Sequence, residues 1–101
     1  MIGEDLIGKK VIVRCDRAGV FYGTLSARNG QEVEMLDVRR LWQWSGAATL
    51  SQLALEGVKR PYNCRFTMQV KSMVLLEAIE IIPCTDEAVA NIDKVPVWKI
   101  C

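Results

Sequence analysis

Residues 39–54 read RRLWQWSGAATLSQLA and bring together two arginines, two tryptophans and the start of a helix. The guanidinium group of arginine is a planar set of donors that suits phosphate, and an indole is a flat surface on which a base or a second guanidinium stacks. Free backbone N–H groups at a helix N-terminus also attract anions. The stretch therefore predicts a pocket for a nucleotide or a phosphodiester, and none of its side chains is a catalytic group.

The same stretch also has a purely structural interpretation. On a strand, Arg40, Trp42 and Trp44 share one face, while Arg39 and the odd-numbered residues share the other. Each tryptophan is therefore as well suited to the core as to a ligand, and arginines are more often solvated or paired with acids than bound to ligands. The sequence leaves both interpretations of the tryptophans open.

Composition places the 101 residues in a single folded domain, 1–101, because 50% are hydrophobic and 25% are charged. A net charge of +1 argues against coating of long nucleic acid, although a local cluster of cations suffices for a small anion. We expect no membrane span, since no apolar run approaches the required length of about 18 residues. The N-terminus lacks the pattern of a signal segment, so a cytosolic protein with reduced thiols is expected.

The residue types argue against catalysis and against a metal site. Histidine is absent, and the four cysteines are scattered without a Cys-x-x-Cys pair, so we expect no structural metal and no cofactor. Acid–base chemistry would have to use a carboxylate, lysine, tyrosine or thiol with a shifted pKa, and no such constellation is evident. The known nucleophile, phosphate-loop and metalloprotease motifs are missing as well. We therefore expect a protein that is not an enzyme.

Upstream of the arginines, the pattern predicts an antiparallel meander. β-Branched and alternating apolar residues favour strands at 8–15, 20–25 and 31–36. Asn29-Gly30 is a strong hairpin signal, and Gly23 predicts a bulge or a close backbone approach. Residues 38–44 are then expected to form a fourth strand that carries the double arginine.

Downstream, short helices and further strands are expected. Ser45 or Thr49 is placed to cap a short helix that ends at Gly57, and Thr85 or Asp86 to cap a second one through residue 93. Residues 65–70 and 74–82 favour strands, and 95–100 an extended segment that covers a sheet edge or reaches a neighbouring subunit. The predicted fold class is α+β, an antiparallel meander sheet with a short central helix and a short C-terminal helix.

Several motifs together resemble a family of small tailed-bacteriophage proteins of unknown function. They are VIVR at 11–14, GTL at 23–25, RRLWxWxGAAxLSQLA at 39–54 and EAIEIIP at 77–83, and the similarity extends over nearly the whole chain. The family offers no established site residue. The resemblance implies a phage lifestyle, in which small proteins without enzyme motifs often act against the host, some of them as oligomeric sponges for cyclic nucleotide or ADP-ribose immune signals.

Residues and resemblance lead to one hypothesis, a counter-defence protein in the host cytoplasm that sequesters a small nucleotide-derived immune signal without cleaving it. A homo-oligomer is expected, with the pocket closed between subunits. The arginines would bind phosphate, the tryptophans would stack on a base, the helix start would supply backbone donors, and further basic residues would assist. The candidate ligand-binding residues are Arg39, Arg40, Trp42, Trp44, Ser45, Gly46, Ala47, Thr49, Arg14, Arg17, Lys59 and Arg60.

Two other binding functions fit the same residues. The first is a protein-interaction module that inhibits a host factor through an Arg/Trp surface, because these two residue types are enriched at binding hot spots. The second is single-stranded nucleic-acid binding, which the near-neutral charge disfavours.

Overall fold

A tight hairpin joins β2 (Val20–Asn29) to β3 (Glu32–Gln43), and β1 (Lys10–Cys15) pairs with the other side of β2. The computed structural model describes residues 2–100, and in them the predicted three-strand meander is confirmed. The turn is centred one residue later than predicted, on Gly30 and Gln31, and Gly30 has a φ of 61°.

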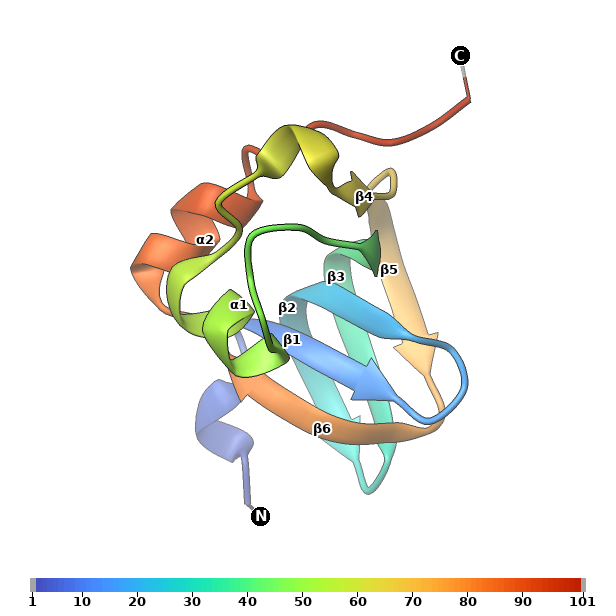
Figure 1. Cartoon of the computed structure of the whole chain (residues 1–101). Coiled ribbons are helices and arrows are strands. Elements are labelled where there is room, and N and C mark those ends of the chain that lie inside the picture. The colour runs from blue at the N-terminus through green and yellow to red at the C-terminus, as the bar shows by residue number, and fades with distance from the viewer. Residues whose placement is uncertain (1, 101) are drawn as a thin grey trace.

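The remaining elements complete an α+β fold (Figure 1). The six-stranded sheet has the order β4-β3-β2-β1-β6, and β5 also pairs with β3; all of these strand pairs are antiparallel. Both α-helices lie on one side of the sheet. The later elements are α1 (Leu50–Glu56), β4 (Arg65–Phe66), β5 (Val70–Leu75), β6 (Ala78–Pro83) and α2 (Asp86–Ile92), with 3₁₀ turns at Glu4–Leu6 (η1) and Pro61–Asn63 (η2).

β1 is buried on both faces, which explains its continuous run of β-branched residues. Val11 and Val13 face one core, which is formed by the strands and against which Leu6 of η1 packs. Ile12 faces a second core, to which α1 contributes Leu53 and α2 contributes Ile92. The strand thus separates a core inside the sheet from a core between the sheet and the helices.

Residues 31–36 and 38–44, predicted as two strands, form the single strand β3, which contains a bulge at Asp37. Asp37 has a φ of 52°, and the register of β2 with β3 shifts opposite it, between Tyr22 and Thr24. Gly23 lies in that shift, and a Cβ there would be 2.9 Å from the Leu36 carbonyl oxygen. The close backbone approach predicted at Gly23 is therefore confirmed.

Both helices are capped by threonine. Thr49 accepts a hydrogen bond from the Gln52 N–H at 3.1 Å, and Thr85 accepts one from Ala88 N–H at 3.1 Å. Ser45, the alternative cap of the first helix, precedes the helix by several residues and does not cap it. Gly57 ends the helix as predicted, with a φ of 78°.

Two predicted strands have different bounds in the structure. The strand expected at 74–82 is interrupted at residues 76–77, so that β5 ends before the interruption and β6 begins after it. The strand expected at 65–70 is limited to the two residues of β4. Each of these segments pairs with a different part of the sheet, and a single continuous strand could not do so.

Candidate functional site

The bulge at Asp37 sets the direction of the double arginine. Beyond it, Leu41 points into the core shared with the helices, and the Arg39 guanidinium lies over Phe66 of that core. Arg40 and Trp42 point to the opposite side, as the alternation predicts. Arg39 is 5% exposed whereas Trp42 is 57% exposed, so the two faces of this part of β3 differ in their access to solvent.

Arg39 is used inside the protein. Its Nε donates to the Thr67 carbonyl at 3.0 Å and its Nη1 to the Ile92 carbonyl at 3.3 Å. Its Nη2 donates to the carbonyls of Phe66 and Pro96, each at 3.2 Å. Burial lowers the pKa of Arg39, but a guanidinium stays charged in proteins. The side chain therefore ties β3 to the end of α2 and to the C-terminal segment.

Arg40 lines a shallow groove of about 320 Å³ on the other face. Its backbone N–H donates to Thr67 Oγ1 at 3.0 Å, and its guanidinium carbon lies 4.9 Å from the centre of the Phe21 ring. Lys99 is a second cation in the groove, and the lining contains no carboxylate. We call it the Arg40–Trp98 groove; it is lined by Val38, Arg40, Thr67, Met68, Val70, Met73, Trp98 and Lys99.

Beside the groove, Trp42 stacks on Trp98. The ring centres are 5.3 Å apart and the planes are inclined by 21°. The guanidinium carbon of Arg65 lies 5.2 Å from each ring centre. Trp98 is 45% exposed, so both rings of this indole pair keep part of their surface open to solvent.

The C-terminal segment that carries Trp98 is held to β4 by backbone contacts. The Trp98 N–H donates to the Phe66 carbonyl at 2.9 Å, and Val97 forms an isolated bridge with Phe66. Figure 1 shows this segment running from α2 past β4 towards the C-terminus. The indole pair therefore joins the end of β3 to a segment without regular secondary structure.

The predicted residues between β3 and α1 lie outside the groove lining and serve the fold. Trp44 and Ala47 are half-buried and pack against the core between the sheet and the helices. The prediction that Trp44 shares the face of Arg40 and Trp42 is therefore wrong, because β3 ends at Gln43 and the strand alternation does not extend to Trp44. Gly46 has a φ of 91°, and a Cβ there would be 2.5 Å from the backbone nitrogen of Lys59. The close approach of the Lys59 backbone therefore explains why this position is a glycine, and no bound ligand is needed to explain it.

Backbone donors near the helix start already have partners. The Ser45 N–H donates to Cys64 Sγ at 3.4 Å, and the Ala48 N–H donates to Gln52 Oε1 at 2.7 Å. Thr49 uses its hydroxyl oxygen to cap Gln52. These residues contribute no groove lining and lie outside the proposed binding site.

The further basic candidates also lie elsewhere. Arg14 forms an ion pair with Glu80 at 3.0 Å, and Arg17 forms one with Glu77 at 2.7 Å. Lys59 and Arg60 are exposed in the loop after α1 and are not part of the groove lining.

Three residues of the observed surface were missed by the sequence analysis: Arg65, Trp98 and Lys99. Trp98 and Lys99 are adjacent in the segment predicted to cover a sheet edge, and this aromatic and basic pair was the sequence signal that could have identified them. Their contact with Trp42 depends on tertiary structure, because β4 and the C-terminal segment are far from β3 in sequence.

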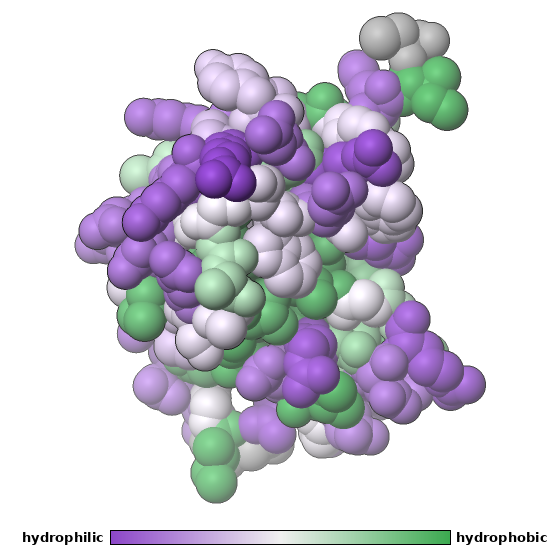
Figure 2. Space-filling model, viewed as in Figure 1, coloured by the Kyte–Doolittle hydropathy of each residue, from purple (hydrophilic) through white to green (hydrophobic). Residues whose placement is uncertain are grey.

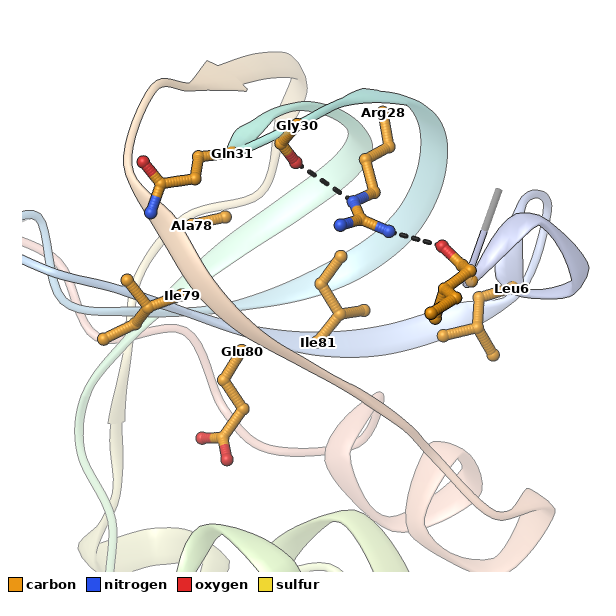
Figure 3. A pocket seen from close by; sticks show the side chains of 10 residues that line it. Leu6, Arg28, Gly30, Gln31, Ala78, Ile79, Glu80 and Ile81 are labelled. Carbon is orange, nitrogen blue, oxygen red and sulfur yellow. Dashed lines mark hydrogen bonds between the residues drawn. The ribbon is translucent and has the colours of Figure 1, made fainter.

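A second cavity, of about 470 Å³, lies along the outer side of β6 (Figure 3). Arg28 reaches across it from β2 and donates to the carbonyls of Ile2 and Gly30. Ile79 and Ile81 of β6 add apolar lining. Arg28 is thus already bonded to backbone carbonyls, and the cavity borders the edge of β6 that does not pair with β1.

The described residues offer little for metal or thiol chemistry. Within 2–100, no cluster of three or more cysteine and acidic side chains is arranged to hold a metal ion. Cys15, Cys64 and Cys84 are free thiols, and burial raises the pKa of Cys84 to about 11. In the same residues no helix is both long and apolar enough to cross a membrane.

Comparisons with known proteins identify the fold and the family. The structure resembles that of a heptameric archaeal Sm protein with a TM-score of 0.51 and 18% sequence identity, over 81% of this chain and 94% of that chain. At this identity the similarity shows the fold alone. No curated protein matches the sequence significantly. Residues 8–92 match the family described as a domain of unknown function, DUF6948, and the chain belongs to that family.

Proposed function

We propose that this protein binds a small nucleotide-derived host immune signal, of the cyclic oligonucleotide or cyclic ADP-ribose type, and retains it without cleaving it. The observation that supports this is one exposed surface on which Arg40 and Lys99 line a groove beside the indole pair. The phage resemblance supports a counter-defence role in the host cytoplasm.

Cations and π surfaces suit the two parts of a nucleotide. Charge-assisted hydrogen bonds from Arg40 or Lys99 would hold phosphate oxygens, and a base stacked on an aromatic ring contributes about 1–3 kcal/mol. The lining of the Arg40–Trp98 groove includes one hydroxyl, that of Thr67, and neither a carboxylate nor a thiol. This donor set favours binding over hydrolysis.

Calorimetric titration tests the proposal with cyclic di-AMP, cyclic di-GMP and cyclic ADP-ribose. At least one of them is expected to bind with a Kd of about 1 μM or lower. Arg40→Ala is expected to weaken that binding by about tenfold or more, through the loss of a charge-assisted contact. Lys94→Ala removes an exposed cation outside the groove and serves as the matched control.

The bound molecule should be recovered chemically intact after heat release, because storage without turnover is proposed. Recovery of a hydrolysed product would contradict retention. Absence of binding by the whole panel would remove the nucleotide proposal altogether.

Docking on a host protein is a second candidate, favoured by the exposure of the indole pair beside Arg65. Purification from infected host lysate separates the two functions. A sponge returns a small molecule on heating, whereas an inhibitor returns a host polypeptide in stoichiometric amount whose binding depends on Trp42 and Arg65.

We also propose that the protein is a homo-oligomer. Among the described strands β5 pairs only with β3 and β6 only with β1, so each presents an open edge. Val74 on β5 and Ile79 on β6 are 60% and 45% exposed, and open edges with apolar side chains tend to pair with another chain. The heptameric state of the Sm protein with a similar fold supports the same proposal. On the face in Figure 2, by contrast, hydrophobic side chains are interspersed with polar ones.

Native mass spectrometry measures the subunit number directly. We expect a defined multiple of the 11.4 kDa chain, and Val74→Lys with Ile79→Lys is expected to shift the protein towards monomer, because lysine on an open edge opposes strand pairing. Leu55→Lys, at an exposed leucine of α1, should leave the assembly unchanged. A wild-type protein that is monomeric at about 100 μM, well above the micromolar range in which weak assembly is detected, would contradict the proposal.

A further inference from the structure

The indole pair has the components of a clamp for a flat ring. We propose that a purine base of the bound nucleotide inserts between Trp42 and Trp98, which separate to receive it; this inference rests on the proposed nucleotide binding. The paired indoles are then the closed, empty form of the base site. The phosphates would lie in the adjoining Arg40–Trp98 groove, since Lys99 directly follows Trp98 and lines it.

The geometry of the pair shows how far it must open. The ring centres are 5.3 Å apart, and the inclination of 21° makes the rings diverge towards one side. A ring held between them needs about 7 Å, which is two contacts of about 3.5 Å each. The ring centres must therefore separate by at least about 2 Å, which exceeds the backbone shift of about 1 Å or less in an ordinary complex and requires a movement of the side chain.

The two indoles differ in how firmly they are supported. Trp42 belongs to β3, whose neighbouring residue Leu41 pairs with Phe66 of β4. Trp98 lies outside helices and strands and is held by its N–H bond to Phe66. Arg39 anchors the same segment at the Pro96 carbonyl, two residues earlier. The Trp98 ring can thus move about a fixed anchor while Trp42 stays in place.

Arg65 adds selectivity for the inserted base. Its guanidinium carbon is 5.2 Å from both ring centres, so it lies beside the pair and reaches both rings. From that position it faces the rim of a base held between them. Guanidinium donates two parallel hydrogen bonds to O6 and N7 of guanine, and N7 of adenine accepts one. The clamp is therefore expected to prefer purines, and guanine among them.

NMR on protein labelled at tryptophan tests the insertion, with cyclic di-AMP, cyclic di-GMP and cyclic ADP-ribose as probes and ribose 5-phosphate as the base-free control. In the free protein, nuclear Overhauser effects should connect the rings of Trp42 and Trp98. Insertion is expected to abolish these and to replace them with effects from the base H8 proton to both rings, whereas ribose 5-phosphate leaves the pair intact.

The outcomes distinguish the clamp from the nucleotide binding on which it depends. Binding of a probe with the Trp42–Trp98 effects retained would overturn the clamp and leave nucleotide binding standing. Failure of all three probes to bind would overturn both.

Variants of Trp98 give an independent readout. Trp98→Ala is expected to weaken probe binding by about tenfold or more, and Trp98→Phe to retain most of it, because a phenyl ring still stacks. Tyr62→Ala removes an 86% exposed aromatic outside the groove and is expected to bind as the wild type does. Equal affinity of the Trp98→Ala and Trp98→Phe proteins would contradict the clamp.

Discussion

Replacing Arg39 with methionine is expected to lower the free energy of unfolding by about 3 kcal/mol. The substitution keeps the apolar stem and removes the guanidinium bonds to four backbone carbonyls. The bonds to Phe66 and Ile92 are buried. Each of these carbonyls keeps one backbone donor, from Trp98 and Val95 respectively, and loses a bond to a charged group worth about 1.5–3 kcal/mol. Relief from the desolvation of the charge offsets part of this loss.

Arg40→Met is the matched control, because the neighbouring arginine is exposed and its side chain donates to none of these carbonyls. Its effect is expected to stay below about 1 kcal/mol. Urea denaturation followed by circular dichroism measures both variants. Equal losses for the two substitutions would show that Arg39 does not hold the C-terminal segment in the way described.

Gly46→Ala is expected to destabilise the protein by a similar amount, about 3 kcal/mol. The backbone at Gly46 has a φ of 91°, which an L-residue rarely adopts. The added Cβ would lie 2.5 Å from the Lys59 nitrogen and 2.8 Å from the Arg60 nitrogen. Both atoms are backbone, so no side-chain rotation relieves the clash and the segment after α1 has to move.

Gly30→Ala separates backbone strain from the clash. Gly30 also has a positive φ, 61°, but nothing lies within 4 Å of its added Cβ. Strain alone predicts a loss of about 1 kcal/mol, measured as a small shift of the thermal midpoint. If Gly46→Ala costs no more than Gly30→Ala, the close approach of the two backbones is not important for stability.

Local signals predicted much of the fold. The meander follows from short strands with alternating or β-branched residues, and both helices begin after the expected type of capping residue. The caps at Thr49 and Thr85 could be predicted because a capping side chain bonds the N–H only three residues later in the sequence. The predicted strand boundaries were wrong where they depend on tertiary pairing. At residues 76–77, for example, one apolar run is divided between β5 and β6, which pair with different strands of the sheet.

The candidate site was predicted in part. Arg40 and Trp42 lie on the exposed surface, and the pattern correctly placed them on the same face of β3. Arg39 was expected to face a ligand beside Arg40, but its guanidinium is bonded to carbonyls from segments distant in sequence, which no local pattern encodes. Trp98 was missed for the same reason, since its stacking partner, Trp42, is distant from it in the sequence.

The bulge at Asp37 determines which face of β3 each of the following residues occupies. Because side chains on a strand alternate with a period of two, removal of one residue there would exchange the environments of Arg39 and Arg40. Arg39 would then face water and lose its bonds to the four carbonyls. Arg40 would enter the core, where its guanidinium would not be aligned with those carbonyls. The spacing between the hairpin turn and the arginine pair is therefore as tightly constrained as the pair itself, and related sequences should change length elsewhere.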